Sequence, residues 1–265
     1  MEFLAREIKP ERMVALTVLK AEFADAEMHA RFEREALAAA HVVHPNVATI
    51  YRVGKRKDGL PFIVREYIGA HSLAESLRSL DLRTLDDATR TIVSLAKALA
   101  AAHAKGIVHG NVRPDNILIE QDSGRVVLAN FGIAGQQEKL TPVDEALSDA
   151  RYTSPEQRRG EAATAANDIF SFGAIAYELL AGRGPTELDQ LLQRCVDNNP
   201  DARPTAEELV QQLAKDELTD APLNLVQPTQ RAAESFLMRA AVFGGAVIMT
   251  IGAAVAYWVY EHYSQ

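Results

Sequence analysis

The sequence predicts an α+β protein built of two unequal lobes. Within the first 70 residues, runs of apolar and β-branched residues typical of strands surround a single helical segment. From Leu73 onward, apolar residues recur mainly at the spacing of amphipathic helices. A strand-rich part followed by a helix-rich part is the order of α+β proteins, and 265 residues are enough for one large domain or two lobes.

The first lobe is predicted to contain at least three strands and one helix. The strands are the runs "MVALTVLK" (13–20), "VATIYRVG" (47–54) and "LPFIVREYIG" (60–69). A segment rich in alanine and paired charges follows the first of them and predicts a helix over 22–43, which a His-Pro pair ends. The last two strands are joined by "KRKDG", whose Asp-Gly step is typical of a hairpin turn.

The second lobe is predicted to be mainly helical. "DDATRTIVSLAKALAAAHAKG" (86–106) has the apolar spacing of a long amphipathic helix and closes on a glycine. Two short strands follow, "NILIE" (116–120) and "RVVLA" (125–129), with an Asp-Ser-Gly turn between them. Apart from a loop around 133–155, the remainder is predicted helical to about residue 215.

The C-terminal segment predicts a membrane anchor. Residues 240–260 contain no charged side chain over 21 positions, and a bilayer core needs roughly 20 such residues in a helix. A buried globular helix is the alternative. Arginines on the near side favour a cytoplasmic bulk at the inner membrane, crossed once. The expected order is a linker over 217–237, a transmembrane helix over 238–260 and a tail of 261–265.

Charge and cysteine content exclude two classes of protein. The formal net charge of -8 disfavours nucleic-acid binding, because there is no basic surplus to neutralise phosphates. The single cysteine, Cys195, allows no intrachain disulfide and fits a reducing compartment. The first 13 residues are charged throughout and are not expected to be a secretory signal.

Seven motifs in one order resemble the eukaryotic-like protein kinase family, in particular its membrane-anchored bacterial Ser/Thr kinases. They are "RFEREALAAAHVVHPNV", "IVREYIGAHSLAESL", "HGNVRPDNILI", "ANFG", "YTSPEQRRG", "NDIFSFGAIAYELLAGRGP" and "CVDNNPDARPTAEEL". The resemblance covers roughly residues 2–213 and implies a two-lobed kinase-like fold. It divides the chain into a partial N-lobe over 1–70 and a helical C-lobe over 71–216.

The N-lobe is expected to be truncated. Only 13 residues precede Val14, which is too few for the family's first two strands and the glycine-rich loop between them. "EFLARE" resembles the second of those strands, so the first strand and its loop are expected to be missing. A mis-assigned start codon is an alternative.

The groups that support phosphoryl transfer are replaced at three positions. The resemblance implies that Thr17 stands where the family has its strand lysine, and Lys20 faces the other side of that strand. Asn111 stands for the catalytic-loop acid and has no carboxylate to accept a proton. Asn130 stands for the metal-binding acid and offers Mg²⁺ one neutral oxygen. The family's residue type or charge is retained at Glu35, Arg113 and Asn116.

The groups that hold the fold in the family are retained. His109 matches a packing position in the catalytic loop, and Asp168 matches the residue that anchors the backbone of that loop, a position that also suits a helix N-cap. Glu156 and Arg203 match a pair that pins the activation segment to the C-lobe. The remaining structural positions implied by the resemblance are Phe131 and Gly132.

The hinge between the lobes contains an unusual arginine. The resemblance implies that Arg65, Glu66 and Ile68 lie in the hinge, at the positions where the family binds the nucleotide. Arg65 stands at the family's gatekeeper position, which is normally uncharged, and it is predicted to enter the space left by the lysine and to pair with Glu35. The alternative is an arginine that extends to solvent.

This pattern of retained and replaced residues supports two functions. The first is a membrane-tethered pseudokinase that binds or scaffolds signalling proteins and needs no cofactor. The second is an active, atypical Ser/Thr kinase that uses ATP and Mg²⁺. A true kinase or a phosphothreonine reader is a candidate partner through four threonines, Thr141, Thr153, Thr219 and Thr229. Oligomerisation through the membrane helix is a further option, on the line of small residues Ala246, Thr250 and Ala254.

Overall fold

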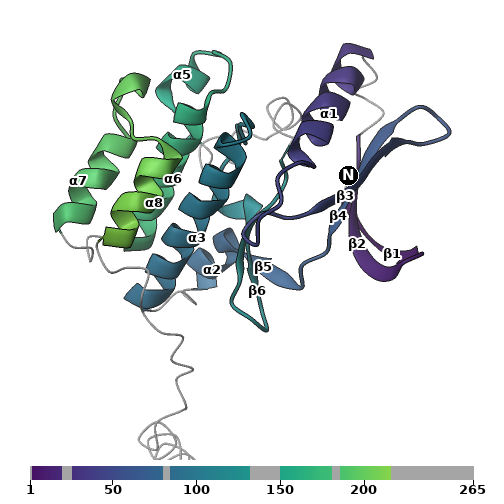
Figure 1. Ribbon diagram of the computed structural model, residues 1–265, viewed down its shortest axis with the longest axis horizontal. Coiled ribbons are helices and arrows are strands. Elements are labelled where there is room, and N and C mark those ends of the chain that lie inside the picture. The colour runs from purple at the N-terminus through teal and green to yellow at the C-terminus, as the bar shows by residue number, and fades with distance from the viewer. Residues whose placement is uncertain (1, 20–25, 80–83, 132–149, 181–185, 216–265) are drawn as a thin grey trace, which may run out of the picture. The chain divides into compact units, whose positions relative to one another are not determined.

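The computed structural model of the chain has the α+β order that the sequence predicts (Figure 1). It describes residues 2–19, 26–79, 84–131, 150–180 and 186–215. All of these lie in one compact unit, Met1–Asp220. Strands and one helix come first, and helices make up most of the remaining described chain.

A four-stranded antiparallel sheet with the order β1-β2-β4-β3 forms the N-terminal part. Its strands are β1 (Glu2–Ile8), β2 (Glu11–Val18), β3 (Ile50–Lys55) and β4 (Pro61–Glu66). Helix α1 (Ala26–Ala39) packs on one face of this sheet, where Phe32 and Ala36 meet Ile63 of β4. The predicted strands and helix are all present in the described residues, with ends shifted by a few positions.

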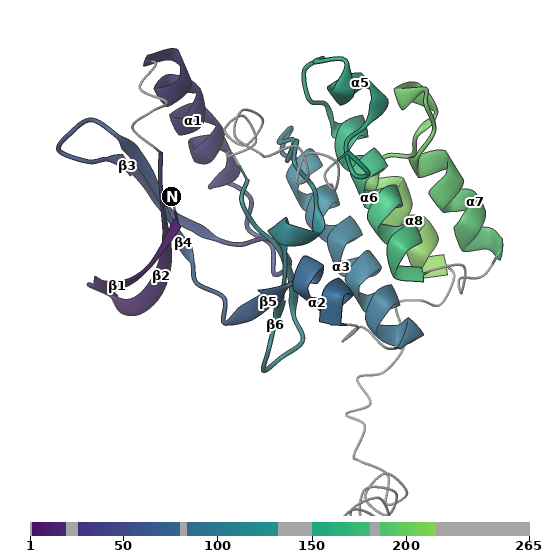
Figure 2. The ribbon, with the colours of Figure 1, turned by 180° about the vertical axis from the view of Figure 1, so that it is seen from behind.

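The C-terminal part is built around two buried helices. Its longer helices are α3 (Leu85–His103), α6 (Ala165–Leu180), α7 (Thr186–Cys195) and α8 (Ala206–Lys215), and its shorter ones are α2 (Leu73–Ser79) and α5 (Pro155–Arg158). The side chains of Leu99 on α3 and Phe172 on α6 are fully buried in its main apolar cluster. Both views show α3 and α6 next to each other (Figures 1 and 2).

Local signals explain where α3 begins and ends. The Thr84 hydroxyl caps the helix by accepting a hydrogen bond from the Asp87 N–H. At the other end Gly106 has a φ of 68°, a left-handed conformation that glycine adopts without strain. The chain then turns back along the helix into the segment around residues 107–116.

A second, three-stranded sheet lies between the two parts. It has the order β5-β6-β7 and consists of β5 (Ala70–Ser72), β6 (Ile117–Glu120) and β7 (Val126–Leu128). The sequence did not predict β5, because three residues are too few to show an alternating pattern. Two short 3-10 turns, Pro114–Asn116 and Pro200–Ala202, complete the described elements.

The segment before β3 ties the two parts together. The Asn46 side chain donates to the Val126 carbonyl at 2.7 Å, and the Ala48 N–H donates to the Leu128 carbonyl at 3.0 Å. Arg125 adds an ion pair of 2.6 Å to Glu66 at the end of β4. These contacts bring the end of β7, and with it the start of the "NFG" motif, close to the end of β4.

Within the ranges that the structure describes, no helix has both the length and the apolar character needed to cross a bilayer. The predicted span 238–260 and its flanking segments lie outside those ranges, and so does the small-residue line within the span. The membrane anchor therefore stays a prediction from the sequence.

Candidate functional site

The loop after α3 is anchored by a buried carboxylate. Asp168 is 1% exposed and accepts hydrogen bonds of 2.8 Å from the N–H groups of His109 and Gly110 and from the ring of His103. The structure thus places Asp168 on the loop backbone. The idea that it also caps α6 is wrong, because α6 begins three residues earlier, at Ala165, and Asp168 lies within its first turn.

His109 braces the same loop from inside. The side chain is buried, its Nδ1 accepts from the Asn111 N–H at 3.2 Å, and its Nε2 lies 2.9 Å from the Ala129 carbonyl. Since Nδ1 accepts, Nε2 carries the proton and donates. Burial lowers the pKa of His109, which the nearby Asp168 carboxylate opposes. The ring packs edge-on against Phe131 at 4.5 Å between centroids, so a neutral imidazole links the loop to the "NFG" motif.

The two positions expected to hold a metal are bonded to each other. The Asn130 amide donates to the side-chain oxygen of Asn116 at 2.9 Å, and the Asn116 amide donates to the Asn111 carbonyl at 2.8 Å. The side-chain oxygen of Asn130 is buried and has no hydrogen-bond partner among the described residues. Asn130 has a φ of 68°, which asparagine tolerates better than most residues.

This donor set does not fit magnesium. Mg²⁺ is bound in proteins through carboxylates and water in near-octahedral geometry. Here the oxygen of Asn116 faces an N–H donor, and the group opposite it is an uncharged amide. These residues therefore do not offer Mg²⁺ the charged oxygens that phosphoryl transfer needs.

Thr17 and Arg65 are buried neighbours on one face of the N-terminal sheet. Thr17 pairs with Ile63 across β2 and β4, and Arg65 lies two residues further along β4. Each is 6% exposed. The guanidinium of Arg65 forms an ion pair with the Glu2 carboxylate and donates to the Glu66 carbonyl at 3.3 Å. The Thr17 hydroxyl and the Arg65 Nε are buried without a partner in the described chain.

The predicted pair of Arg65 with Glu35 is wrong. Glu35 is bound by Arg31, one turn earlier on α1, at 2.7 Å. Arg65 reaches Glu2 instead, because Glu2 stands directly opposite Thr17 on β1 and therefore lies on the same face of the sheet. The alternative of an exposed arginine is wrong as well, because Arg65 is buried. Burial lowers the pKa of its guanidinium, and the Glu2 and Glu66 carboxylates oppose this shift.

Two further predicted positions, Ile68 and Arg113, have simple surroundings. Ile68 in the hinge is buried in a cluster with Ala48 and Ala129, the residue directly before the "NFG" motif. Arg113 pairs at 3.2 Å with Asp115, which is half exposed. Gly132 and Lys20 lie outside the described residues.

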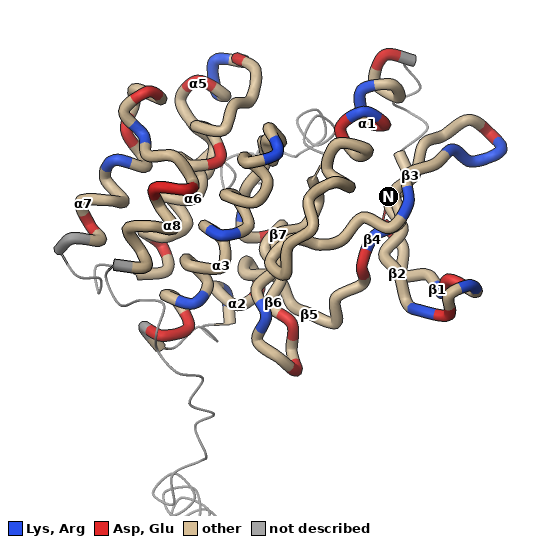
Figure 3. Tube along the Cα trace, viewed as in Figure 1, with Lys and Arg blue, Asp and Glu red and all other residues tan. Residues whose placement is uncertain are grey.

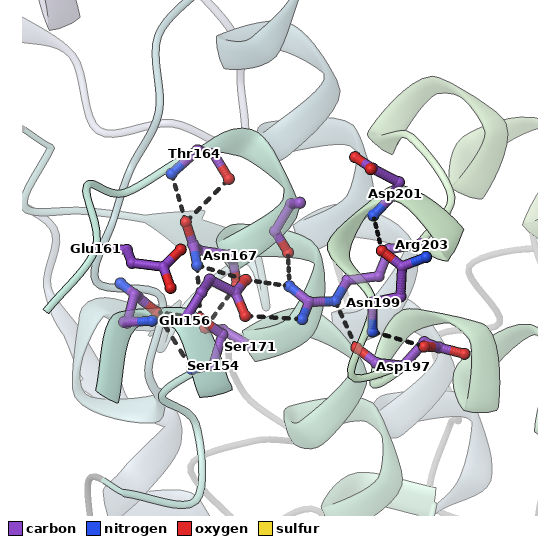
Figure 4. Close-up of polar contacts among 12 residues, drawn as sticks. Ser154, Glu156, Glu161, Thr164, Asn167, Ser171, Asp197, Asn199, Asp201 and Arg203 are labelled. Atoms are coloured by element: carbon purple, nitrogen blue, oxygen red, sulfur yellow. Dashed lines mark hydrogen bonds and ion pairs between the residues drawn. The ribbon is translucent and has the colours of Figure 1, made fainter. Parts of the chain in front are cut away.

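A buried ion pair holds the short helix α5 to the C-terminal helices (Figure 4). Arg203 binds the Glu156 carboxylate through both terminal nitrogens, one of them at 3.0 Å, and lowers the pKa of Glu156. Asn167, directly before Asp168, adds a bond of 2.7 Å to Glu156. Asn167 was not singled out from the sequence, although its place beside a predicted anchor was a usable signal.

Asp168, His109 and the pair of Glu156 with Arg203 thus join the loop after α3, the "NFG" motif and α5 to the C-terminal helices. A family model described as "Protein kinase domain" matches residues 3–189. The chain therefore belongs to the protein kinase domain family.

Bacterial Ser/Thr kinases are among its relatives. The chain is 36% identical over 186 residues to the serine/threonine-protein kinase PrkC of Bacillus subtilis, covering 69% of this chain and 28% of PrkC. It is 34% identical over 189 residues to the serine/threonine-protein kinase PknB of Mycobacterium leprae, covering 69% and 30% respectively. The probable serine/threonine-protein kinase PknB of Lactococcus lactis is 35% identical over 182 residues. The match spans less than a third of the length of PrkC or PknB.

Proposed function

We propose that this chain is a pseudokinase: a kinase-like domain that binds signalling proteins and does not transfer phosphate. The observation that carries the proposal is the hydrogen bond between Asn130 and Asn116, the two positions that would hold Mg²⁺. Because the Asn130 amide donates to the Asn116 oxygen, a hydrogen bond within the protein takes the place of a bond between that oxygen and a metal.

The magnitudes support inactivity. A positioned base contributes about 10²–10⁴-fold to the rate, and Asn111 has no carboxylate to serve as one. Charge stabilisation by the strand lysine and the metal is worth roughly several kcal/mol each, and Thr17 and Asn130 supply neither charge. These replacements lie on three separate segments and affect one reaction, so the remaining rate enhancement is small.

The retained contacts support a role that depends on shape. The loop anchor of Asp168, the packing of His109 and the buried pair of Glu156 with Arg203 all maintain the C-terminal part. Leaving these groups unpaired would cost several kcal/mol. A binding module needs a fixed surface of this kind, and protein partners, including a true kinase acting on Thr153, are its proposed ligands.

An active, atypical Ser/Thr kinase is the alternative. It is favoured by the relatives, which are named as serine/threonine-protein kinases, and by Asn116, Arg113 and Glu35, which keep the residue type or charge of the family.

Radiolabel transfer separates these two functions. The full-length chain is incubated with γ-labelled ATP and Mg²⁺ or Mn²⁺. The possible phosphate acceptors are the chain itself and an added basic protein. The pseudokinase predicts no incorporation above that of a chain-free control. Incorporation that is lost in an Asn130→Ala variant would establish the alternative.

Membrane tethering through 238–260 is part of the proposal and is supported by the uncharged run in the sequence. An arginine at the centre of a membrane helix costs about 2.5–3.5 kcal/mol on insertion scales. An Ile248→Arg variant is therefore expected to shift the chain from the carbonate-resistant membrane fraction toward the supernatant. An unchanged distribution would argue against this span.

A further inference from the structure

The two middle strands of the N-terminal sheet, β2 and β4, are apolar on both faces, although α1 packs on one of them. On the face away from α1 the alternate residues are Val14, Leu16 and Val18 of β2 and Phe62 and Val64 of β4. In an antiparallel sheet with one solvated face, such positions are usually polar. Figures 1 and 2 show α1 on one side of the sheet and no described helix on the other. This second face therefore carries apolar surface that α1 does not cover.

A groove of about 420 Å³ lies on this face. The strand register sets Leu16 of β2 between Phe3 of β1 and Val64 of β4. On its other side, Val64 stands beside Arg52 of β3. One row of side chains thus crosses the sheet over three strand spacings, about 14 Å. The row is apolar along most of its length and ends at an arginine.

A glycine on β3 keeps the groove open. Gly54 stands opposite Phe62, and a Cβ at Gly54 would lie 2.8 Å from the tip of the Phe62 ring. The ring therefore leans over the glycine and away from Val18, its neighbour on β2. The space above Val18 and Leu16 thus depends on the absence of a side chain at position 54.

The polar end of the row is accessible. The guanidinium of Arg52 lies 5.9 Å from the centre of the Phe62 ring, and the side chain is 60% exposed, so its stem lies near the aromatic ring while its head reaches solvent. Glu7 also lines the groove, but it is bonded to Arg12 at 2.7 Å and lies 3.8 Å from Arg52. The Arg52 head is therefore held only loosely by this carboxylate.

The groove keeps a positive surplus when its ion pairs are counted. Three arginines and one glutamate line it, a net charge of +2: Arg6, Arg52, Arg56 and Glu7. The other members of their ion pairs contribute a net charge of -1: Glu11, Asp58 and Arg12. The surplus is thus +1, and Figure 3 shows that β3 and the turn after it carry mainly basic residues. Such a groove favours an anionic head group over a cationic one.

We infer that the groove binds a free fatty acid, with the alkyl chain over Leu16 and Val64 and the carboxylate on Arg52. Apolar clefts of about 300–1,000 Å³ with a few polar groups are typical of small-molecule sites. A protein interface buries about 800 Å² on each partner, far more than one row of side chains provides. Arginine binds a carboxylate through charge-assisted, bidentate hydrogen bonds, and each buried methylene adds hydrophobic stabilisation. One apolar row that ends in an arginine matches one alkyl chain that ends in a carboxylate.

Photo-crosslinking of the full-length chain tests the site. The chain is mixed with phosphatidylcholine vesicles that contain a palmitate analogue with a diazirine in its alkyl chain, and after irradiation mass spectrometry locates the label. We expect label on the peptides of β2 and β4. Analogues with the same alkyl chain and an alcohol or an ammonium head are expected to label these peptides about tenfold less, because they lack the charged hydrogen bond to arginine.

Three variants separate the head group from the chain. Arg52→Gln is expected to lower labelling by the palmitate analogue about tenfold and to leave labelling by the alcohol analogue unchanged. Arg34→Gln is the matched control, because Arg34 is an exposed arginine on α1, on the other side of the sheet, and no change is expected. Gly54→Ala changes no charge but pushes the Phe62 ring into the groove, and it is expected to lower labelling by both analogues while circular dichroism shows the fold retained.

Label confined to peptides outside β2 and β4 would overturn the inference, as would equal labelling by the carboxylate and ammonium analogues or labelling that Arg52→Gln leaves unchanged. Equal labelling of these strands by a phosphatidylcholine with the same diazirine chain would also overturn it, because the groove would then be a contact with the bilayer. The labelling is measured without ATP, so its outcome does not depend on whether the chain transfers phosphate.

Discussion

The buried pair of Arg203 with Glu156 allows a stability prediction to be worked from the structure. The Arg203 side chain is fully buried and that of Glu156 is 5% exposed. Arg203 also donates to the backbone carbonyls of Asp197 at 2.8 Å and Ala166 at 2.9 Å. Replacing Arg203 by methionine keeps an apolar stem of similar length and removes all four bonds.

The expected loss is large because the partner remains. Breaking a buried ion pair by removing one member costs about 3–5 kcal/mol, since a charge is left in the interior. In Arg203→Met the Glu156 carboxylate keeps the donor of Asn167, which offsets part of that cost. A typical domain is stable by about 5–15 kcal/mol, so the loss is a large share of the total. The double variant Glu156→Leu with Arg203→Met is expected to be less destabilised than Arg203→Met alone.

Urea unfolding of the full-length chain, followed by far-UV circular dichroism, measures these differences. Arg159→Met is the matched control, because the pair of Arg159 with Glu161 is exposed at 59% and 55% and is worth about 0–1 kcal/mol. If Arg203→Met costs no more than this control, or if the double variant loses as much as the two single variants together, the reasoning about the buried pair is refuted.

Three further predictions concern the C-terminal part. Gly173→Ala is expected to lower the melting temperature by the equivalent of about 1–3 kcal/mol, because the new Cβ would lie 2.6 Å from the Cβ of Cys195. This clash is expected to outweigh the higher helix propensity of alanine. A higher melting temperature would contradict this. The stability contributed by His109 is present above about pH 6.5 and is lost as the pH falls toward its depressed folded-state pKa. Urea titrations at several pH values are therefore expected to show a free energy of unfolding that falls with pH in this range, and His109→Asn is expected to lack that dependence. The same pH dependence in both proteins would count against a neutral, buried ring. Asp168→Ala is expected to raise the hydrogen-exchange rate of the Gly110 amide by at least tenfold, and an unchanged rate would show that the loop is held by other contacts.

The arrangement of strands and helices was predictable because it rests on local periodicity. The apolar and β-branched run "MVALTV" in β2 and the three-four spacing of α3 each appear within one segment of sequence. The ends of these strands and helices were less predictable. The predicted helix over 22–43 is described from Ala26 to Ala39, because alanine-rich sequence carries little information on where a helix starts.

The pairing of buried charges was only partly predictable. The partners of Glu156 and Asp168 could be inferred from the family's motifs, whose spacing the chain keeps. The partner of Arg65 could not, because Glu2 lies 63 residues away in the sequence, on a strand that none of the seven motifs includes. Arg65 pairs with a carboxylate on β1 and not with the expected carboxylate on α1. Only the strand register shows that the β1 carboxylate lies on the same face of the sheet as Arg65.

With Thr17, Asn111 and Asn130 in place of the charged groups, the chain is expected not to bind magnesium-bound nucleotide. Isothermal titration of the full-length chain with ATP, with and without Mg²⁺, tests it most directly, with a Thr17→Lys, Asn130→Asp double variant as the comparison. We predict no binding heat from the natural chain under either condition, and a gain of Mg-dependent binding in the double variant. Saturable, Mg-dependent binding of ATP to the natural chain would contradict the claim.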